Sequence, residues 1–290
     1  MKNSNKDNSD KTLLTKMDLS PTAALVLDFS KGLYQENELL KRYVETLDLS
    51  SAEELVKDYK AEGLYDLACE QLVNRKYMVR ESALKLISEI QAKQVVIIAA
   101  GLSPLGLEIA IQTESLQTNI YEVDLEFNAK AETLMKLFPQ ATKRIHFLIK
   151  DITAPDLVNS FPNYDSQQPT LIIIEGITHY LTPTVFDQLL QTFRNKGKNR
   201  LVVEYAPPFD QLNVKMKSKA ELAYHIIEKR YHAIGMTKYT PGQLKKIIES
   251  EHGEWIQHFT MSEVEELRTG KNHFFNPGES GWVEVATAKI

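Results

Sequence analysis

The sequence predicts an α/β fold in which strands alternate with helices and form one Rossmann-like sheet. Apolar runs without alternation recur between residues 94 and 206, as is typical of strands that are buried on both faces of a parallel sheet. Segments of helical spacing separate these runs, so the middle of the chain is a βαβ series. The chain has 290 residues, of which 43% are hydrophobic, and this is enough to form a substantial core.

The first 90 residues predict a helical layer that precedes the sheet. Residues 1 to about 18 are polar and are expected to form a flexible arm. Apolar residues recur at helical spacing over 21–33, 38–47 and 64–72. The segment 51–54 is typical of a helix start, because a serine can cap it and its acids suit the first turn. We therefore divide the chain into an N-terminal arm and helical layer, 1–90, and a sheet domain, 91–290.

Seven strands are expected in the sheet domain. Five of them, which should be parallel, are residues 94–100, 118–124, 144–150, 169–175 and 200–206. Near the C-terminus, residues 255–260 and 281–290 alternate between apolar and polar, which predicts an antiparallel pair at the sheet edge. Residues 207–250 are expected to form a helical insertion that overhangs the strand ends and acts as a lid.

Polar or small residues follow the carboxyl ends of the parallel strands. They are Gly101, Asp124, Asp151, Glu175 and Tyr205. In doubly wound sheets a ligand binds in the crevice outside these ends, so the five residues are expected to lie in one region. Glycine at position 101 lets the backbone turn tightly where a ligand approaches. The pattern predicts a pocket for a nucleotide-type cofactor.

Composition excludes several classes of function. The balance of 34 basic and 39 acidic residues gives a net charge of -5, which offers no electrostatic footprint for nucleic acid. No apolar run approaches the roughly 18 residues of a membrane span. The single cysteine, Cys69, permits no intramolecular disulfide, and the polar start contains no signal-peptide core. The seven histidines are scattered, so no metal site is expected. We expect a cytoplasmic protein that binds neither membrane nor nucleic acid.

Four motifs carry a resemblance to a known family. They are Ala100-Gly101-Leu102, Tyr121-Glu122-Val123-Asp124-Leu125, Lys150-Asp151-Ile152 and Ile174-Glu175-Gly176-Ile177-Thr178-His179-Tyr180-Leu181. In this order and spacing they resemble the leucine carboxyl methyltransferase family, which includes protein phosphatase carboxyl methyltransferases and bacterial small-molecule O-methyltransferases. The resemblance covers roughly residues 70–206 and is specific only in combination. It implies a class I S-adenosylmethionine-dependent methyltransferase of the bacterial small-molecule branch.

The resemblance also implies which residues bind S-adenosylmethionine. They are Arg80, Ala100, Gly101, Asp124, Leu125, Asp151, Ile152, Glu175 and Gly176. Arg80 is similar to the family arginine that pairs with the methionine carboxylate, although Arg75 and Lys76 lie close by and either could serve. Asp124 would accept hydrogen bonds from the ribose hydroxyls, and Asp151 would lie beside the adenine.

The sequence departs from the family pattern in two places. Ala99-Ala100-Gly101 stands where the family has Gly-x-Gly, and the Asp-Thr step that follows is absent. An alanine suits the first position if its φ is negative. After Glu175-Gly176, the sequence Thr178-His179-Tyr180-Leu181 replaces Met-Tyr-Leu and brings a histidine to the edge of the site.

The expected reaction is O-methylation of a carboxylate or hydroxyl group on a small metabolite. A carboxylate is already ionised near neutral pH, whereas a phenol or alcohol needs a base, for which His179 and Tyr205 are the candidates. The sequence is also compatible with three other hypotheses about function. One is a non-catalytic binding module on the same fold, and another is a carboxyl methyltransferase of a protein C-terminus. The third is a nicotinamide oxidoreductase, against which the missing phosphate-binding glycines count.

Overall fold

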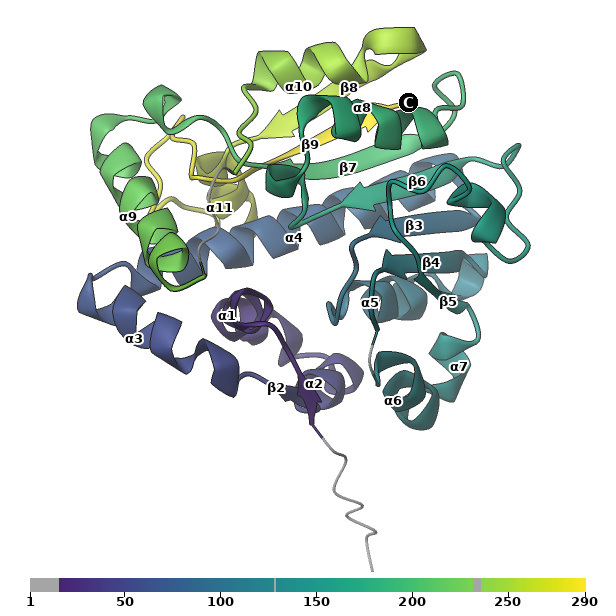
Figure 1. Cartoon of the computed structure of the whole chain (residues 1–290), viewed down its shortest axis with the longest axis horizontal. Coiled ribbons are helices and arrows are strands. Elements are labelled where there is room, and N and C mark those ends of the chain that lie inside the picture. Colours follow the sequence, from purple (N-terminus) through teal and green to yellow (C-terminus); the bar gives the residue numbers. More distant parts are fainter. Residues whose placement is uncertain (1–15, 128, 232–235) are drawn as a thin grey trace, which may run out of the picture.

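A computed structural model of the chain describes residues 16–127, 129–231 and 236–290 (Figure 1). The predicted arm therefore lies almost wholly outside the described residues, as do residues 232–235 of the predicted insertion. In the described part of the chain, seven strands form one sheet in the order β5-β4-β3-β6-β7-β9-β8. The mixed α/β architecture confirms the predicted fold class.

The sheet strands lie close to their predicted positions. They are β3 (Gln94–Ile98), β4 (Asn119–Asp124), β5 (Ile145–Ile149), β6 (Thr170–Ile174), β7 (Arg200–Tyr205), β8 (Glu254–Phe259) and β9 (Glu284–Lys289). The first five pair in parallel, and β9 pairs antiparallel with both β7 and β8. The two expected closing strands are thus present as an antiparallel pair beside β7.

Helices cover both faces of the sheet because the strand side chains alternate between two apolar layers. In β3, Val95 and Ile97 face one layer, and Val96 and Ile98 face the other. The first layer is closed by α4 (Tyr65–Ile90), α5 (Leu105–Gln112) and α11 (Met261–Thr269). The second is closed by α8 (Pro183–Phe193) and α10 (Pro241–Ile248). Two short helices, α6 (Lys130–Leu137) and α7 (Pro139–Thr142), connect β4 to β5.

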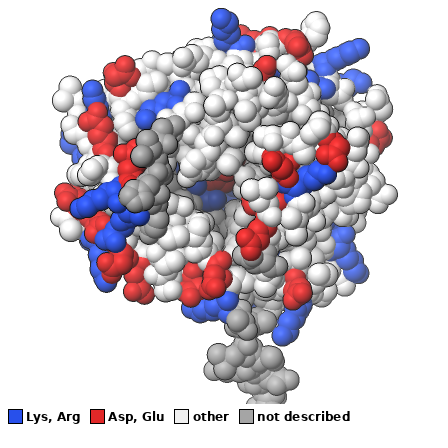
Figure 2. Space-filling view, in the orientation of Figure 1, with Lys and Arg blue, Asp and Glu red and all other residues white. Residues whose placement is uncertain are grey.

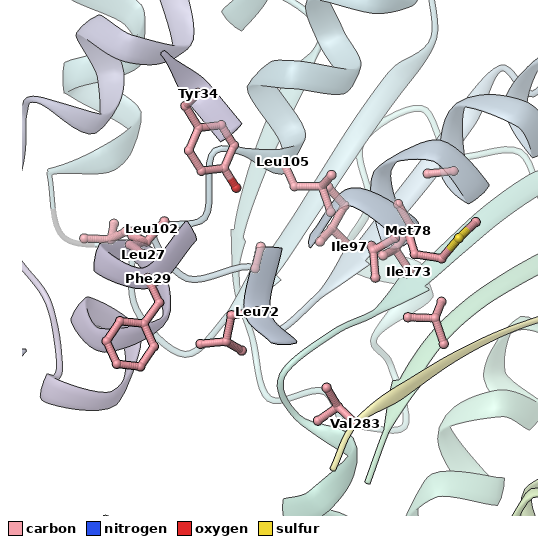
Figure 3. Packing of buried hydrophobic residues seen from close by; sticks show 14 of the residues in the cluster. Leu27, Phe29, Tyr34, Leu72, Met78, Ile97, Leu102, Leu105, Ile173 and Val283 are labelled. Carbon is pink, nitrogen blue, oxygen red and sulfur yellow. The ribbon is translucent and has the colours of Figure 1, made fainter. Parts of the chain in front are cut away.

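The N-terminal helical layer lies over the carboxyl ends of the strands. It consists of α1 (Pro21–Ser30), α2 (Glu38–Val44) and α3 (Glu53–Ala61), with a two-residue parallel ladder between β1 (Met17–Asp18) and β2 (Leu47–Asp48). Figure 3 shows Leu27 and Phe29 of α1 in one apolar cluster with Leu72 of α4 and Leu102 of the loop after β3. This packing places α1 directly above the predicted pocket.

The described residues of the predicted insertion contain two α-helices, of which α10 packs against the second layer of the sheet. The other is α9 (Val214–Tyr231), which packs beside α3. The Tyr59 hydroxyl donates to the carbonyl of Ala223 at 2.9 Å, and Arg230 forms an ion pair with Asp58 at 2.6 Å. The insertion and the N-terminal layer are therefore in direct contact. None of the described helices combines the length and the apolar character that crossing a bilayer requires.

Candidate active site

A cavity of about 330 Å³ opens at the carboxyl ends of β3, β6 and β7, beneath α1. Figure 2 shows a hollow near the middle of the molecule, with basic and acidic side chains inside it. Much of the wall is apolar and comes from α1, α4, α9, the chain next to α1 and α9, and the segment before β9. These wall residues include Leu19, Ala23, Val26, Leu72, Ile227, Met236, Trp282 and Val283. The charged residues of the wall are Arg75, Lys76, Glu175 and Glu204.

The loop between β3 and α5 is held by hydrogen bonds to three consecutive carbonyl groups. Lys130 Nζ donates to the carbonyls of Gly101 and Ser103, each at 2.9 Å. The Tyr43 hydroxyl of α2 donates to the carbonyl of Leu102 at 2.9 Å. A rigid first loop can present its backbone to a ligand in one geometry. Sequence reasoning missed Lys130 and Tyr43, because neither belongs to a motif.

Lys130 is also half of a fully buried ion pair. Its Nζ lies 2.7 Å from Glu122 Oε2 of β4, and both side chains are 0% exposed. Burial raises the pKa of Glu122 and lowers that of Lys130, while their mutual attraction opposes both shifts. Gly106 of α5 permits this arrangement, because a Cβ there would collide with Glu122 Oε1. The pair therefore joins α6 to β4 and to the first loop, and α5 packs closely against it at Gly106.

Ala99, the first residue of this loop, does not have the negative φ that would make an alanine suitable. Its φ is 52°, in the left-handed region, where an L-residue is strained by roughly 1 kcal/mol. We expect Ala99→Gly to raise the free energy of unfolding by up to about 1 kcal/mol, measured by urea denaturation. The matched control is Ala100→Gly, which changes a residue of negative φ and should destabilise the protein. Equal effects of the two substitutions would contradict this account.

Two cations of α4 converge on one carboxylate at the end of β6. Arg75 Nε lies 3.1 Å and Lys76 Nζ 3.0 Å from Glu175 Oε1, and all three side chains are less than 10% exposed. Burial raises the pKa of Glu175, but Lys76 and Arg75 outweigh burial, so the pKa falls below its usual value. The two Nη atoms of Arg75 make no hydrogen bond to any described residue, and Arg75 lines the cavity. This guanidinium edge is available for a ligand carboxylate.

Arg80 lies on a different side of α4. Its Nε pairs with Glu81 at 2.9 Å and its Nη1 with the buried Glu108 at 3.1 Å. It is not among the residues that line the cavity, whereas Arg75 and Lys76 are. The structure therefore brings the two competing cations to the cavity and places the predicted arginine outside it.

Asp124 and its neighbours form an open edge beside the cavity. The Asp124 carboxylate accepts hydrogen bonds from the backbone N–H groups of Gly101 at 2.8 Å and Leu125 at 2.7 Å. Leu125 is 71% exposed. At the end of β5, Asp151 accepts from the backbone and side chain of Thr153, and these bonds lower the pKa of Asp151. Ile152 is half-buried in the loop after Asp151.

The end of β6 brings Glu175 and Gly176 to the cavity wall together with the first loop. Gly176 adopts a φ of 76° and donates its backbone N–H to Glu204 Oε2 at 2.6 Å. Ala100 and Gly101 line the same cavity. Of the nine predicted cofactor residues, the structure thus gathers four around the cavity and four along the open edge, and it leaves Arg80 apart.

The two predicted catalytic residues lie on opposite sides of the sheet. His179 lines the cavity, and its buried Nδ1 has no hydrogen-bond partner among the described residues. Tyr205 is fully buried on the far face of β7, where its hydroxyl donates to Glu284 Oε2 at 2.8 Å. Because side chains alternate along a strand, it is Glu204 that points into the cavity. The structure therefore offers no path from Tyr205 to a ligand in the cavity.

Comparison with known proteins agrees with the family resemblance. The family model of leucine carboxyl methyltransferases matches residues 35–194. A candidate S-adenosyl-L-methionine-dependent methyltransferase of Mycolicibacterium paratuberculosis (strain ATCC BAA-968 / K-10) is 31% identical over 147 residues. These residues are 46% of this chain and 44% of the relative, so the match spans less than half of the relative's length.

Solved structures share the fold. A candidate methyltransferase from Thermobifida fusca YX has a TM-score of 0.57 at 16% identity, over 93% of this chain and 95% of that chain. The CurJ carbon methyltransferase has a TM-score of 0.50 at 17% identity, over 93% of this chain and 67% of its own. The family model covers more than half of the sequence. The chain belongs to the leucine carboxyl methyltransferase family.

Proposed function

We propose that this protein is an S-adenosylmethionine-dependent O-methyltransferase that acts on a small molecule. The observation that carries the proposal is the guanidinium edge of Arg75, whose Nη atoms have no hydrogen-bond partner in the described part of the chain. This edge lies at the cavity beside Lys76 and the first loop. A buried cation pair that shares one carboxylate is suited to bind a second, ligand carboxylate. When bound, S-adenosylmethionine supplies an electrophilic methyl group on a sulfonium centre.

The residues around the cavity fit the methionine part of this cofactor. Arg75 and Lys76 would hold its carboxylate, and Glu175 keeps both cations in place. The backbone from Ala100 to Gly101 borders the same space, fixed by Lys130. Chain groups that are already held in position lose little freedom on binding.

The open edge fits the adenosine part. The Asp124 carboxylate is oriented by two backbone N–H groups and keeps lone pairs for the ribose hydroxyls. Leu125 and Ile152 supply apolar surface for a base, and Asp151 lies next to them as an acceptor for an exocyclic amine. The high exposure of Leu125 is the kind of apolar surface that a bound ring would cover.

The enclosure of the cavity favours a small acceptor over a protein C-terminus. α1 covers one side, and Tyr224 and Ile227 of α9 line another. A volume of about 330 Å³ lies in the range of small-ligand sites. A peptide tail would need a groove that is open along its length, so we favour a metabolite.

Calorimetric titration with S-adenosylmethionine, S-adenosylhomocysteine and NAD tests the proposal, with Arg75→Gln and Arg80→Gln as a matched pair. We expect the adenosyl ligands to bind and Arg75→Gln to weaken them by at least about tenfold, because a charge-assisted hydrogen bond is lost. Arg80→Gln should change affinity by less than about threefold, yet lower stability, because Glu108 stays buried without its partner.

The other outcomes would point elsewhere. Binding of NAD in preference to both adenosyl ligands would favour an oxidoreductase. Failure of all three ligands to bind would favour a non-catalytic module. Unchanged S-adenosylhomocysteine affinity in Arg75→Gln and in Asp124→Asn would overturn the proposed binding residues.

A further inference from the structure

We propose that the methyl acceptor is a neutral hydroxyl group on a largely apolar molecule, and that His179 and Glu204 act together as the base that takes its proton. This inference rests on the proposed function, because it concerns the acceptor of the same site. It chooses between the carboxylate and hydroxyl acceptors that the sequence leaves open, and it adds Glu204 to the catalytic groups.

Two residues that line the cavity, Glu204 and His179, each carry a buried polar atom without a hydrogen-bond partner among the described residues. Glu204 is 0% exposed and its Oε1 has no hydrogen-bond partner among the described residues. The Nδ1 of His179 is likewise buried and without a partner in the described chain. Both side chains line the same cavity, and Thr178, which precedes His179 in the chain, donates its hydroxyl to the Glu204 carbonyl at 2.6 Å. A buried polar atom without a partner is costly, so both atoms point to a function.

The backbone fixes both residues at the edge of the cavity. Glu204 Oε2 accepts from the N–H of Gly176 at 2.6 Å, and the Thr178 hydroxyl donates to the Glu204 carbonyl at 2.6 Å. The His179 carbonyl accepts from the N–H of Thr237 at 2.8 Å. One carboxylate oxygen of Glu204 is thus used to anchor the loop after β6, and the other is left for the histidine.

The pairing assigns a role to each nitrogen of His179. In this pairing Nδ1–H donates to Glu204 Oε1, which fixes the tautomer in which Nε2 is the acceptor. The acceptor hydroxyl gives its proton to Nε2, and its oxygen forms a bond to the methyl carbon. The carbon–sulfur bond breaks at the same time, and its electron pair remains on sulfur. The imidazolium that results is stabilised by Glu204 until the proton passes to solvent.

The surroundings of His179 keep it neutral near pH 7. Burial lowers its pKa, Glu204 opposes this shift, and Arg75 adds to it. The other titratable groups that line the cavity are Lys76, Glu175, Tyr59, Tyr180 and Tyr224. Burial raises the pKa of all three tyrosines, so none becomes an anion in the neutral range.

The charge balance of the cavity favours a hydroxyl over a carboxylate acceptor. Arg75 and Lys76 face two carboxylates, Glu175 and Glu204, so the four side chains sum to zero. If the cofactor carboxylate takes the free edge of Arg75, no cation of this wall remains for a second anion. A carboxylate acceptor would also lie against the buried Glu204 and be repelled. The apolar remainder of the wall suits an aromatic or alicyclic body.

A matched pair of ligands tests the acceptor class by binding alone. 1-Naphthol and 1-naphthoic acid carry a hydroxyl and a carboxylate on the same ring, and each is titrated into protein saturated with S-adenosylhomocysteine. We expect naphthol to bind at least tenfold more tightly than naphthoic acid. In Glu204→Gln the difference in affinity between the two ligands should become smaller. If S-adenosylhomocysteine itself does not bind, the proposed function falls. If it binds and naphthoic acid binds better than naphthol, this inference alone is overturned.

The role of His179 and Glu204 as the base is tested by pH profiles of methyl transfer to naphthol. We expect His179→Gln to lower kcat by about 10²–10⁴-fold without weakening S-adenosylhomocysteine by more than threefold. In the wild type, kcat/KM should fall as pH drops through the pKa of His179. Because Glu204 raises this pKa, Glu204→Gln should shift the fall in kcat/KM to lower pH. His273→Gln, which changes an exposed histidine, is the control and should match the wild type. A loss of kcat below threefold in His179→Gln would overturn the assignment of His179 and Glu204 as the base. So would a pH dependence of kcat/KM that Glu204→Gln leaves unchanged.

Discussion

Replacement of Lys130 by methionine is expected to lower the free energy of unfolding by about 3–5 kcal/mol, because it leaves the Glu122 carboxylate buried without its counter-ion. The carbonyls of Gly101 and Ser103 lose their donor in the same step. The first loop is then no longer fixed, so S-adenosylhomocysteine should bind at least about tenfold more weakly in protein that is still folded. Urea denaturation and calorimetry measure the two effects separately.

A double substitution separates stability from binding. In Glu122→Leu/Lys130→Met the buried charge is removed together with its partner, and apolar side chains of similar size take both places. Such replacements are often neutral or stabilising, so most of the lost stability should return. Binding should not return, because the loop carbonyls still have no donor. Recovery of binding in the double variant, or a loss of less than about 1 kcal/mol in the single one, would contradict the role given to Lys130.

The sheet could be predicted from the sequence because its signal is local. The clearest strands, residues 94–98 and 170–174, are short runs rich in aliphatic residues that are buried on both faces. Of the two closing strands, β8 lies at the sheet edge and is largely exposed, whereas β9 lies between β7 and β8 and is buried. The topology of the sheet then brings the carboxyl ends of the parallel strands together, so that the N–H of Gly101 contacts the Asp124 carboxylate.

The site was less predictable because it depends on which side of an element a residue faces. Arg75 and Arg80 are five positions apart, which is about 140° around a helix, and the motif alone does not tell which one faces the cavity. Glu204 and Tyr205 are adjacent in β7 and therefore face opposite layers. Lys130 follows a strand and a turn at a helix start, where a lysine is usually solvated. Only its ion pair with the buried Glu122 of β4 shows that Lys130 is not solvated.

Gly281→Ala is expected to lower the free energy of unfolding by about 2–4 kcal/mol and to raise KM for the acceptor while S-adenosylhomocysteine affinity changes little. Gln71 of α4 is fully buried, and its Oε1 accepts from the N–H of Trp282 at 3.0 Å, which fixes a wall of the cavity. A Cβ at Gly281 would collide with this Oε1 and lie 2.6 Å from Met261 Cγ, so either the hydrogen bond breaks or the backbone moves. The control is Gly32→Ala, where an added Cβ meets nothing within 4 Å. Equal loss of stability in the two variants would mean that close packing at Gly281 does not hold this wall in place.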